Sequence, residues 1–303
     1  MSFFSIEFLL IFFVFFIAYN FFDIKKQNAL LLCFNMVFLY LINPYFLIIV
    51  FAYSFFIHFF ALSIYTRKTI NSLFTALFFI VCNLCFFKFY ASLKDSFDLI
   101  FSFLKLDIAN VVFPLGISFY TFNSITYLVL VYKEKKEPVK FLTLFTYLSF
   151  FVTFISGPIF RFNKFYEQYN RLKRFKHKDL VISNLLLALI KIFLLLPIID
   201  KYFCTLLDEL DNLSIVGLLN CFYLYSIKLY FDFSAYINFV TALGLIIGFK
   251  LPKNFNNPFK SVNIKDFWRR WHISLSSFIR DYIYIPLGGN KNNKTYQNKK
   301  SSK

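Results

Sequence analysis

The chain has 303 residues, of which 59% are hydrophobic and 23% aromatic, with 49 Phe and only 7 Gly. This apolar share is far above that of a soluble domain, so an ordinary soluble enzyme is excluded. The formal net charge is +17, from 33 Lys and Arg against 16 Asp and Glu. The basic residues lie between the apolar blocks, which is typical of a membrane protein and argues against a nucleic-acid partner.

A membrane-crossing helix needs about 20 mostly apolar residues with few charges. Blocks that fit one crossing each are residues 3–22, 70–87, 108–131, 141–158 and 181–200. The block 29–64 is too long for one crossing and is interrupted by Asn43-Pro44, so it predicts two. The block 213–249 also exceeds one crossing, and its polar island Asp232-Phe233-Ser234 indicates a break between two helices.

These blocks predict an all-α fold: a polytopic integral membrane bundle with about eight transmembrane helices and additional interfacial helices. Residues 1–290 are expected to form one membrane domain, and residues 291–303 a polar basic tail. Lys25-Lys26 and Arg67-Lys68 are separated by two expected crossings and fall on one side. The positive-inside bias makes that side cytoplasmic, which places the N-terminus outside a cytoplasmic (inner) membrane. Residues 3–22 lack a basic leading region and a small-residue cleavage site, so they predict a retained span and not a signal peptide.

Several polar features have plain structural interpretations. Cys82-x-x-Cys85 has no second pair and lies among apolar neighbours, so we interpret it as packing and expect no metal site. His58 is expected in the core, and His177 is expected to be solvated within a basic run.

Two further segments carry polar residues at the ends of apolar blocks. Residues 114–122 interleave small, hydroxyl and aromatic residues, which favours a helix-packing face over the lining of a polar cavity. Ser156-Gly157-Pro158 ends the next apolar block, and the chain from there to Lys178 is predicted to be a basic amphipathic surface.

Asp232 lies in the middle of an apolar block. An ionisable group there tends to face a cavity or a partner, so a functional role is the first hypothesis. Lys228 precedes it by one helical turn, and a structural ion pair between the two is the alternative.

Residues 266–290, DFWRRWHISLSSFIRDYIYIPLGGN, concentrate both tryptophans, one of the three histidines and five charged residues. Asn263 has the spacing of a helix N-cap, with Asp266 in the first turn. We predict one helix from there to about Tyr284, ended by Pro286 and the following glycines. Such a helix is too charged to cross lipid alone, so it is expected at the interface or along a hydrated funnel.

On that helix Trp268, His272 and Ser276 would share one face, with Arg269 beside them. Further pairs of charged residues in the segment are Asp266 with Arg270, and Arg280 with Asp281. The imidazole of His272 can accept a proton near neutral pH, so it could deprotonate a hydroxyl that attacks an acyl donor. The alternative is a structural histidine that only donates a hydrogen bond.

The segment FWRRWHISLSSFIRDYIYIPLGGN resembles the signature of the membrane-bound O-acyltransferase (MBOAT) family, in the AlgI-like branch of bacterial polysaccharide O-acetyltransferases. Three further segments resemble this branch in the same order: FPLGISFYTFNSITY, ISGPIFRFNKF and LYFDFSAYINFVTALGLIIGFKLPKNFNNPF. The resemblance implies a multispan bundle around a funnel, with an acyl donor such as acetyl-CoA as a cytoplasmic substrate and no bound cofactor. The acceptor would be a periplasmic acyl-accepting transferase or a cell-surface polysaccharide, such as an alginate-like glycan or peptidoglycan.

Within this resemblance His272 matches the family's RRWH histidine and is the expected catalytic residue. Arg269 and Arg270 would hold anionic phosphates. Asp266 would orient Arg270, and the tryptophans would fix the helix at the interface. The residues expected to bind substrate or support the site are Asp232, Asn254, Asp266, Trp268, Arg269, Arg270, Trp271, Ser276, Arg280 and Asp281.

The family's second histidine, regarded as invariant and catalytic, belongs in a later LWHG-like span. No His follows His272 in this sequence, and the residues after Asn290 are polar. We therefore expect a C-terminally shortened form and leave enzymatic activity of the isolated chain open. The alternatives are an inactive remnant, one half of a split acyltransferase, or a transporter with Asp232 and Lys228 as pathway charges.

Overall fold

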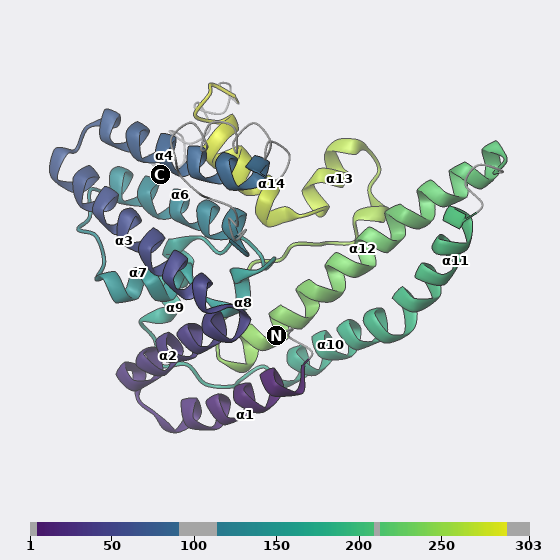
Figure 1. Cartoon of the computed structure of the whole chain (residues 1–303), viewed down its shortest axis with the longest axis horizontal. Coiled ribbons are helices and arrows are strands. Elements are labelled where there is room, and N and C mark those ends of the chain that lie inside the picture. Colours follow the sequence, from purple (N-terminus) through teal and green to yellow (C-terminus); the bar gives the residue numbers. More distant parts are fainter. Residues whose placement is uncertain (1–4, 91–113, 209–212, 290–303) are drawn as a thin grey trace, which may run out of the picture. The chain divides into compact units, whose positions relative to one another are not determined.

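The computed structural model describes residues 5–90, 114–208 and 213–289 (Figure 1). All regular elements within these ranges are helical, which confirms the all-α class. Contacts group the chain into two compact units, described separately below. Unit 1 comprises Met1–Lys176 with Ile246–Phe249, and unit 2 comprises His177–Leu245 with Lys250–Lys303. The expectation of one membrane domain over 1–290 stays a prediction.

Four helical stretches in the described residues are long and apolar enough to cross a membrane, where the sequence predicts about eight crossings. They are Pro44–Arg67, Ile70–Tyr90, Lys178–Asp208 and Ile215–Ile246. The apolar helix Ile6–Phe21 is shorter. At about 1.5 Å per residue it falls short of the roughly 30 Å hydrocarbon layer. Residues 108–113 of another expected crossing lie outside the described residues.

Unit 1 is built from helices whose starts follow from local sequence. Its elements are α1 (Ile6–Phe21), α2 (Ile24–Ile42), α3 (Pro44–Arg67), α4 (Ile70–Tyr90), α6 (Ile117–Glu134), α7 (Phe141–Leu148), α8 (Phe151–Phe154) and α9 (Phe162–Tyr169). The predicted break at Asn43-Pro44 is confirmed: α2 ends, the Asn43 side chain accepts from the Tyr45 N–H at 2.9 Å, and Pro44 opens α3. Proline suits this first helical position because its missing N–H would have no helical partner.

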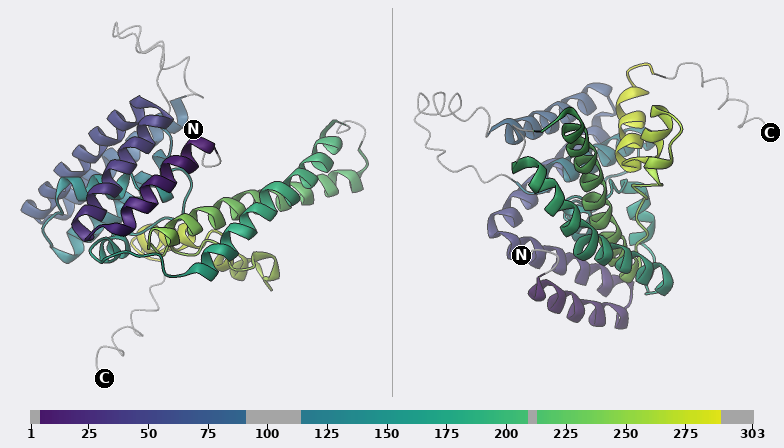
Figure 2. Two further views of the ribbon diagram at one scale, coloured as in Figure 1. Left: turned by 90° about the horizontal axis from the view of Figure 1, so that it is seen from below. Right: turned by 90° about the vertical axis from the view of Figure 1, so that its right-hand side faces the viewer.

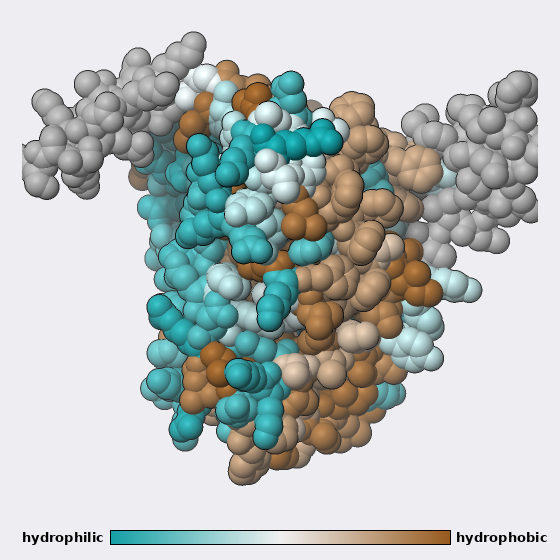
Figure 3. Space-filling view, turned by 90° about the vertical axis from the view of Figure 1, so that its left-hand side faces the viewer, coloured by the Kyte–Doolittle hydropathy of each residue, from teal (hydrophilic) through white to brown (hydrophobic). Residues whose placement is uncertain are grey.

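The core of unit 1 is aromatic, and part of its surface is apolar as well. Phe34 of α2 lies between Phe15 of α1 and Phe151 of α8, with ring centroids 4.3 and 4.7 Å away. Large hydrophobic side chains remain exposed along α3 and α4, for example Phe59 and Phe78. One face of the molecule carries a broad hydrophobic area beside a hydrophilic one (Figure 3). Such exposed apolar surface is expected where a protein contacts lipid.

Residues 141–158 do not form the predicted crossing. They fold into the short helices α7 and α8, which are almost wholly buried. The amide of Asn35 explains the break between them, because it donates to the Thr146 carbonyl at 3.1 Å and accepts from the Phe151 N–H at 3.2 Å. A buried polar side chain thus replaces helical hydrogen bonds where the chain turns.

The polar start of α6 serves helix packing, the interpretation favoured from sequence. Gly116 has φ of +74°, and a Cβ there would collide with the Phe154 carbonyl oxygen of α8. Tyr120, Thr121 and Ser124 are buried. The small residue therefore lets two backbones approach closely.

The basic stretch after Pro158 is only partly a surface. Helix α9 is amphipathic as predicted, with Phe162, Phe165 and Tyr169 buried. His177 is exposed as expected. Lys173, however, is only 2% exposed, which corrects the expectation that this run is solvated.

Lys173 is buried because unit 1 supplies partners for it. Its Nζ donates to Asn28 Oδ1 at 2.7 Å and to the Tyr169 carbonyl at 3.0 Å. Its backbone is held by Gln27, whose amide accepts from the Lys173 N–H at 3.1 Å and donates to the Lys173 carbonyl at 2.7 Å. Gly248, with φ of +80°, lies against the lysine stem where a Cβ would crowd it. Burial lowers the pKa of Lys173 to about 8.

Unit 2 contains two long helical stretches followed by short elements. Its elements are α10 (Lys178–Leu189), the π-helical turn η2 (Ile190–Leu195), α11 (Leu196–Asp208), α12 (Ile215–Ile246), the 3₁₀ turn η4 (Pro258–Lys260), α13 (Ile264–Arg270), α14 (Ile273–Ile279) and the π-helical turn η5 (Arg280–Tyr284). Figure 2 shows the stretch from α10 to α11 running beside α12.

Helix α12 corrects the prediction of two helices over 213–249, because it is continuous through Asp232-Phe233-Ser234. Asp232 is exposed, and the Ser234 hydroxyl donates within the helix to the Phe231 carbonyl at 3.3 Å. Neither residue takes a backbone hydrogen bond away from the helix, so the polar island does not interrupt it.

Candidate functional site

The RRWH segment forms a break between two helices and not the single predicted helix. Asn263 caps α13 as predicted, because its side chain accepts from the Asp266 N–H at 2.8 Å. Helix α13 ends at Arg270, and Trp271 is extended. His272 then adopts the left-handed conformation with φ of 40°, and α14 begins at Ile273. A left-handed backbone at a residue other than Gly costs on the order of 1–3 kcal/mol, so the surroundings must hold it.

The loop from Lys250 to Asn257 holds this break in place. The Ile273 N–H donates to the Asn254 carbonyl at 2.8 Å, and the Asn256 N–H donates to the Arg270 carbonyl at 3.0 Å. In a continuous helix the Ile273 N–H and the Arg270 carbonyl would both form hydrogen bonds within the helix. Here the loop supplies their partners, on both sides of His272. Sequence spacing could not reveal them, because both partners lie outside the helix.

Aromatic rings enclose the break. Trp271 stacks on Phe267 with centroids 5.5 Å apart and meets the edge of Phe255 at 5.1 Å. The His272 ring meets Phe233 of α12 edge-on at 4.9 Å. The imidazole therefore has an apolar wall on the α12 side.

Two side chains at the break carry buried polar atoms without a partner in the described part of the chain. They are Asn254, with both Nδ2 and Oδ1, and His272, with Nε2. Asn254 is only 1% exposed. Buried polar groups are almost always hydrogen-bonded, so such a cluster needs an explanation such as a missing ligand. Burial lowers the pKa of His272 to about 4, so its ring is neutral near pH 7 and one nitrogen can accept a hydrogen bond.

The sequence of this segment is shared with known proteins. Residues 59–299 match the model of the MBOAT, membrane-bound O-acyltransferase, family. The chain belongs to the MBOAT family. The match covers most of the chain and contains the whole described break at His272.

Curated relatives of this MBOAT chain carry names that describe the modification of alginate, peptidoglycan or teichoic acid. It is 37% identical to a probable alginate O-acetylase AlgI of Azotobacter vinelandii, over 72% of this chain and 45% of the relative. It is 33% identical to a peptidoglycan O-acetyltransferase of Helicobacter pylori, over 70% and 45%. It is 36% identical to a teichoic acid D-alanyltransferase of Bacillus subtilis, over 58% and 46%. The alignments with these curated relatives thus span about half of their length.

The arginines of the RRWH segment have different surroundings in this MBOAT chain. Arg270 pairs with Asp266 through Nε at 2.8 Å, which confirms the predicted i,i+4 pair. Arg270 also donates to the Asn256 carbonyl at 3.4 Å, so it braces the loop. Arg269 is exposed. Arg270 therefore supports the break, and the expectation that Arg269 and Arg270 hold phosphates stays a prediction.

The other residues predicted for the site lie on α13 and α14, on either side of the break, or on η5. Trp268 is 54% exposed, as an interfacial anchor would be. The Ser276 hydroxyl donates to the Trp271 carbonyl at 3.3 Å, so it caps the break. The exposed Arg280 pairs with its half-buried neighbour Asp281 at 2.7 Å on η5.

Asp232 is not neutralised by Lys228, because Lys228 pairs with Asp200 of α11 at 2.8 Å. Asp232 itself is exposed on α12. The structural ion pair between Lys228 and Asp232 is therefore not formed.

Sequence reasoning missed a polar cavity of about 540 Å³ in unit 2, lined by α10, η2, α12 and the loop from Lys250 to Asn257. Asn254 lies in its wall, together with Lys191 of η2 and Asn238 of α12. Lys191 is an ionisable residue within an apolar block. The rule that drew attention to Asp232 would have identified it.

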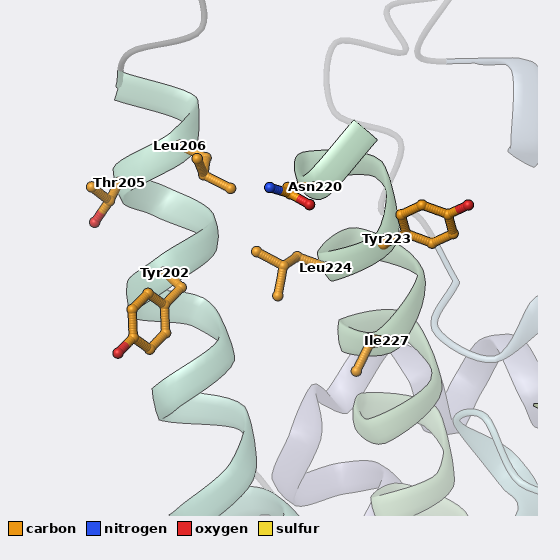
Figure 4. A pocket seen from close by; sticks show the side chains of 7 residues that line it. All are labelled: Tyr202, Thr205, Leu206, Asn220, Tyr223, Leu224 and Ile227. Carbon is orange, nitrogen blue, oxygen red and sulfur yellow. The ribbon is translucent and has the colours of Figure 1, made fainter. Parts of the chain in front are cut away.

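A second cavity in unit 2, of about 470 Å³, is mostly apolar (Figure 4). Leu206 of α11 and Asn220 and Leu224 of α12 point into the space between the two helices. It holds no acid, base or nucleophile beyond hydroxyls, so we assign the chemistry to the break at His272.

Proposed function

We propose that this chain takes part in O-acyl transfer, passing an acetyl group from a cytoplasmic donor such as acetyl-CoA to hydroxyls of a cell-surface polysaccharide. The observation that carries the proposal is the pair Asn254 and His272, whose buried polar atoms have no partner in the described part of the chain. Family membership and the acetyltransferase names of the relatives support it.

In the proposed reaction the acceptor hydroxyl attacks the thioester carbonyl of the donor. A C–O bond forms, the C–S bond breaks, and the hydroxyl proton passes to the leaving thiolate. The neutral His272 ring can accept a hydrogen bond from the acceptor hydroxyl and relay its proton. The Asn254 amide can donate to the developing oxyanion, where fixed donors in a dry site are most effective.

The same proposal extends to the protein's setting. We propose that it lies in the cytoplasmic membrane with its N-terminus outside. Lys25-Lys26 lie at the start of α2 and Arg67-Lys68 at the end of α3, and the positive-inside bias favours the cytoplasmic side for both pairs. Its partners would be a periplasmic acyl-accepting transferase or the polysaccharide, and a second chain that supplies the remaining length of the relatives. The alternative of an inactive remnant predicts no transfer at all.

The test replaces His272 with Ala in the natural genomic setting, so that any separately encoded partner is present. We expect transfer of labelled acetyl groups to cell-surface glycan to fall at least about 100-fold, as for loss of a general acid–base group. His177→Ala removes an exposed histidine and is the matched control. Membrane abundance of each variant is measured by immunoblot. Unchanged transfer by His272→Ala would remove this residue from the mechanism.

A further inference from the structure

The cavity in unit 2 has a lining suited to an anion. Three of its lining residues are lysines, namely Lys191, Lys250 and Lys253, and five are asparagines. None of the described residues that line it is Asp or Glu. A concave site of one charge sign attracts ligands of the opposite sign, and amides add neutral hydrogen-bond donors.

Lys191 is held in place by a chain of amides and not by an acid. Its Nζ donates to Asn238 Oδ1 at 2.7 Å, and Asn238 Nδ2 donates to Asn184 Oδ1 at 2.8 Å. Asn184 in turn donates to the Leu180 carbonyl at 2.8 Å. An ammonium has three protons, so the bond to Asn238 leaves two that can serve a ligand.

The position of Lys191 is costly without such a ligand. It lies on the π-helical turn η2, inside a helical stretch long and apolar enough to cross a membrane. A lysine in the middle of a span is costly to insert into lipid, and such residues mark binding or transport sites. π-Helical turns are themselves frequent at functional sites.

Asn254 gives a second, independent indication of a ligand. Its side chain is 1% exposed and lines the same cavity, yet neither amide atom has a partner in the described part of the chain. A buried amide left without partners costs free energy unless a bound group satisfies it.

We propose that this cavity binds a phosphate ester, with Lys191 and Lys253 as its cations. Phosphate fits better than carboxylate, because three lysines without an acid match a group of more than one negative charge and several acceptor oxygens. Lysine serves such groups as a point charge. With a soluble donor as the ligand the inference rests on the proposed function. Ligand binding is measured without catalysis, so a failure of binding is distinguishable from a failure of acyl transfer.

Two sources carry this chemistry at a membrane: the diphosphate of a soluble donor and the phosphate of a lipid headgroup. The test uses the full chain, purified in uncharged maltoside detergent, and titrates it by microscale thermophoresis. The probes are coenzyme A, inorganic diphosphate, and a short-chain phosphatidic acid below its micelle concentration. Sodium glucuronate is the carboxylate probe.

We expect Lys191→Gln and Lys253→Gln each to weaken binding at least about tenfold, while Lys191→Arg retains it. Lys201→Gln removes an exposed lysine of α11 outside the cavity and is the control with the same charge change. Binding of coenzyme A and diphosphate identifies a soluble source, and binding of phosphatidic acid alone identifies a lipid. Absence of binding by all three, equal binding of glucuronate, or binding that survives both Gln variants would overturn the proposal. Lys253 is exposed, so its variant is informative even if Lys191→Gln fails to fold.

Discussion

The polar clusters around Lys173 in unit 1 and around Asn254 and His272 in unit 2 are both buried, but they differ in whether their atoms have partners. Gln27 uses its amide donor and acceptor on the backbone of Lys173, and the Lys173 ammonium has two hydrogen bonds. Asn254 has no partner for its side chain, and His272 has none for Nε2, within the described residues. The first cluster is complete within the protein, whereas the second is incomplete without a ligand.

The difference separates a structural role from a functional one. A satisfied buried group stabilises the fold, and removing one partner leaves the others unpaired. An unsatisfied group lowers stability, and proteins keep such groups where a substrate will meet them. The same type of substitution should therefore have opposite effects on stability in the two clusters.

The largest effect is expected for Gln27→Leu. Leucine leaves the Lys173 N–H and carbonyl and the Tyr19 carbonyl without their buried partner. Each buried group left unpaired costs about 1–3 kcal/mol, so we expect a loss of at least about 3 kcal/mol. The measurement is the apparent melting temperature in detergent. Gln168→Leu is the control and should change it far less, because Gln168 is only half-buried and its amide donates to the Lys164 carbonyl within α9.

A smaller effect of opposite sign is expected for Asn254→Leu. Leucine branches at Cγ as asparagine does, and its two methyl groups replace two unpartnered polar atoms beside a cavity, so stability should rise by about 1 kcal/mol. The Asn254 carbonyl keeps its bond to the Ile273 N–H, so the break should remain. The same variant should lose acetyl transfer. If it melts several degrees lower than the unmodified chain, the amide is structural and the comparison between the two clusters fails.

Local sequence signals predicted those parts of the fold and site that local contacts determine. The break at Asn43-Pro44, the cap at Asn263 and the pair Asp266–Arg270 depend on residues at most four positions apart. The amphipathic α9 follows from helical periodicity in the same way. His272 was selected by its chemistry and by the resemblance of its segment to a family.

The features that sequence did not predict depend on distant residues. The left-handed turn at His272 is set by bonds from Asn254 and Asn256, and the break within 141–158 is set by Asn35. Helix α12 is continuous because Asp232 faces outward, which periodicity in a uniformly apolar block cannot show. Lys191 was overlooked although its position in an apolar block carried the same signal as Asp232.

A further effect is expected from pH, and it compares the unmodified chain with His272→Gln, whose side chain cannot take up a proton. The pKa of His272 is lowered to about 4 by burial, against an ordinary value of 6.5. Between these values the unfolded chain binds a proton that the folded chain does not. Stability contributed by the neutral ring is therefore fully present above pH 6.5 and lost as pH falls toward 4.

The apparent melting temperature of the unmodified chain should consequently fall more steeply from pH 6.5 to 4 than that of His272→Gln, which cannot take up the proton. The carboxylates titrate in both proteins, so the difference between the two curves isolates the imidazole. His177→Gln, at an exposed histidine, should follow the unmodified chain across the whole range. Parallel curves for His272→Gln and the unmodified chain would mean that the ring is solvated, and a solvated ring needs no ligand to explain its unpaired Nε2.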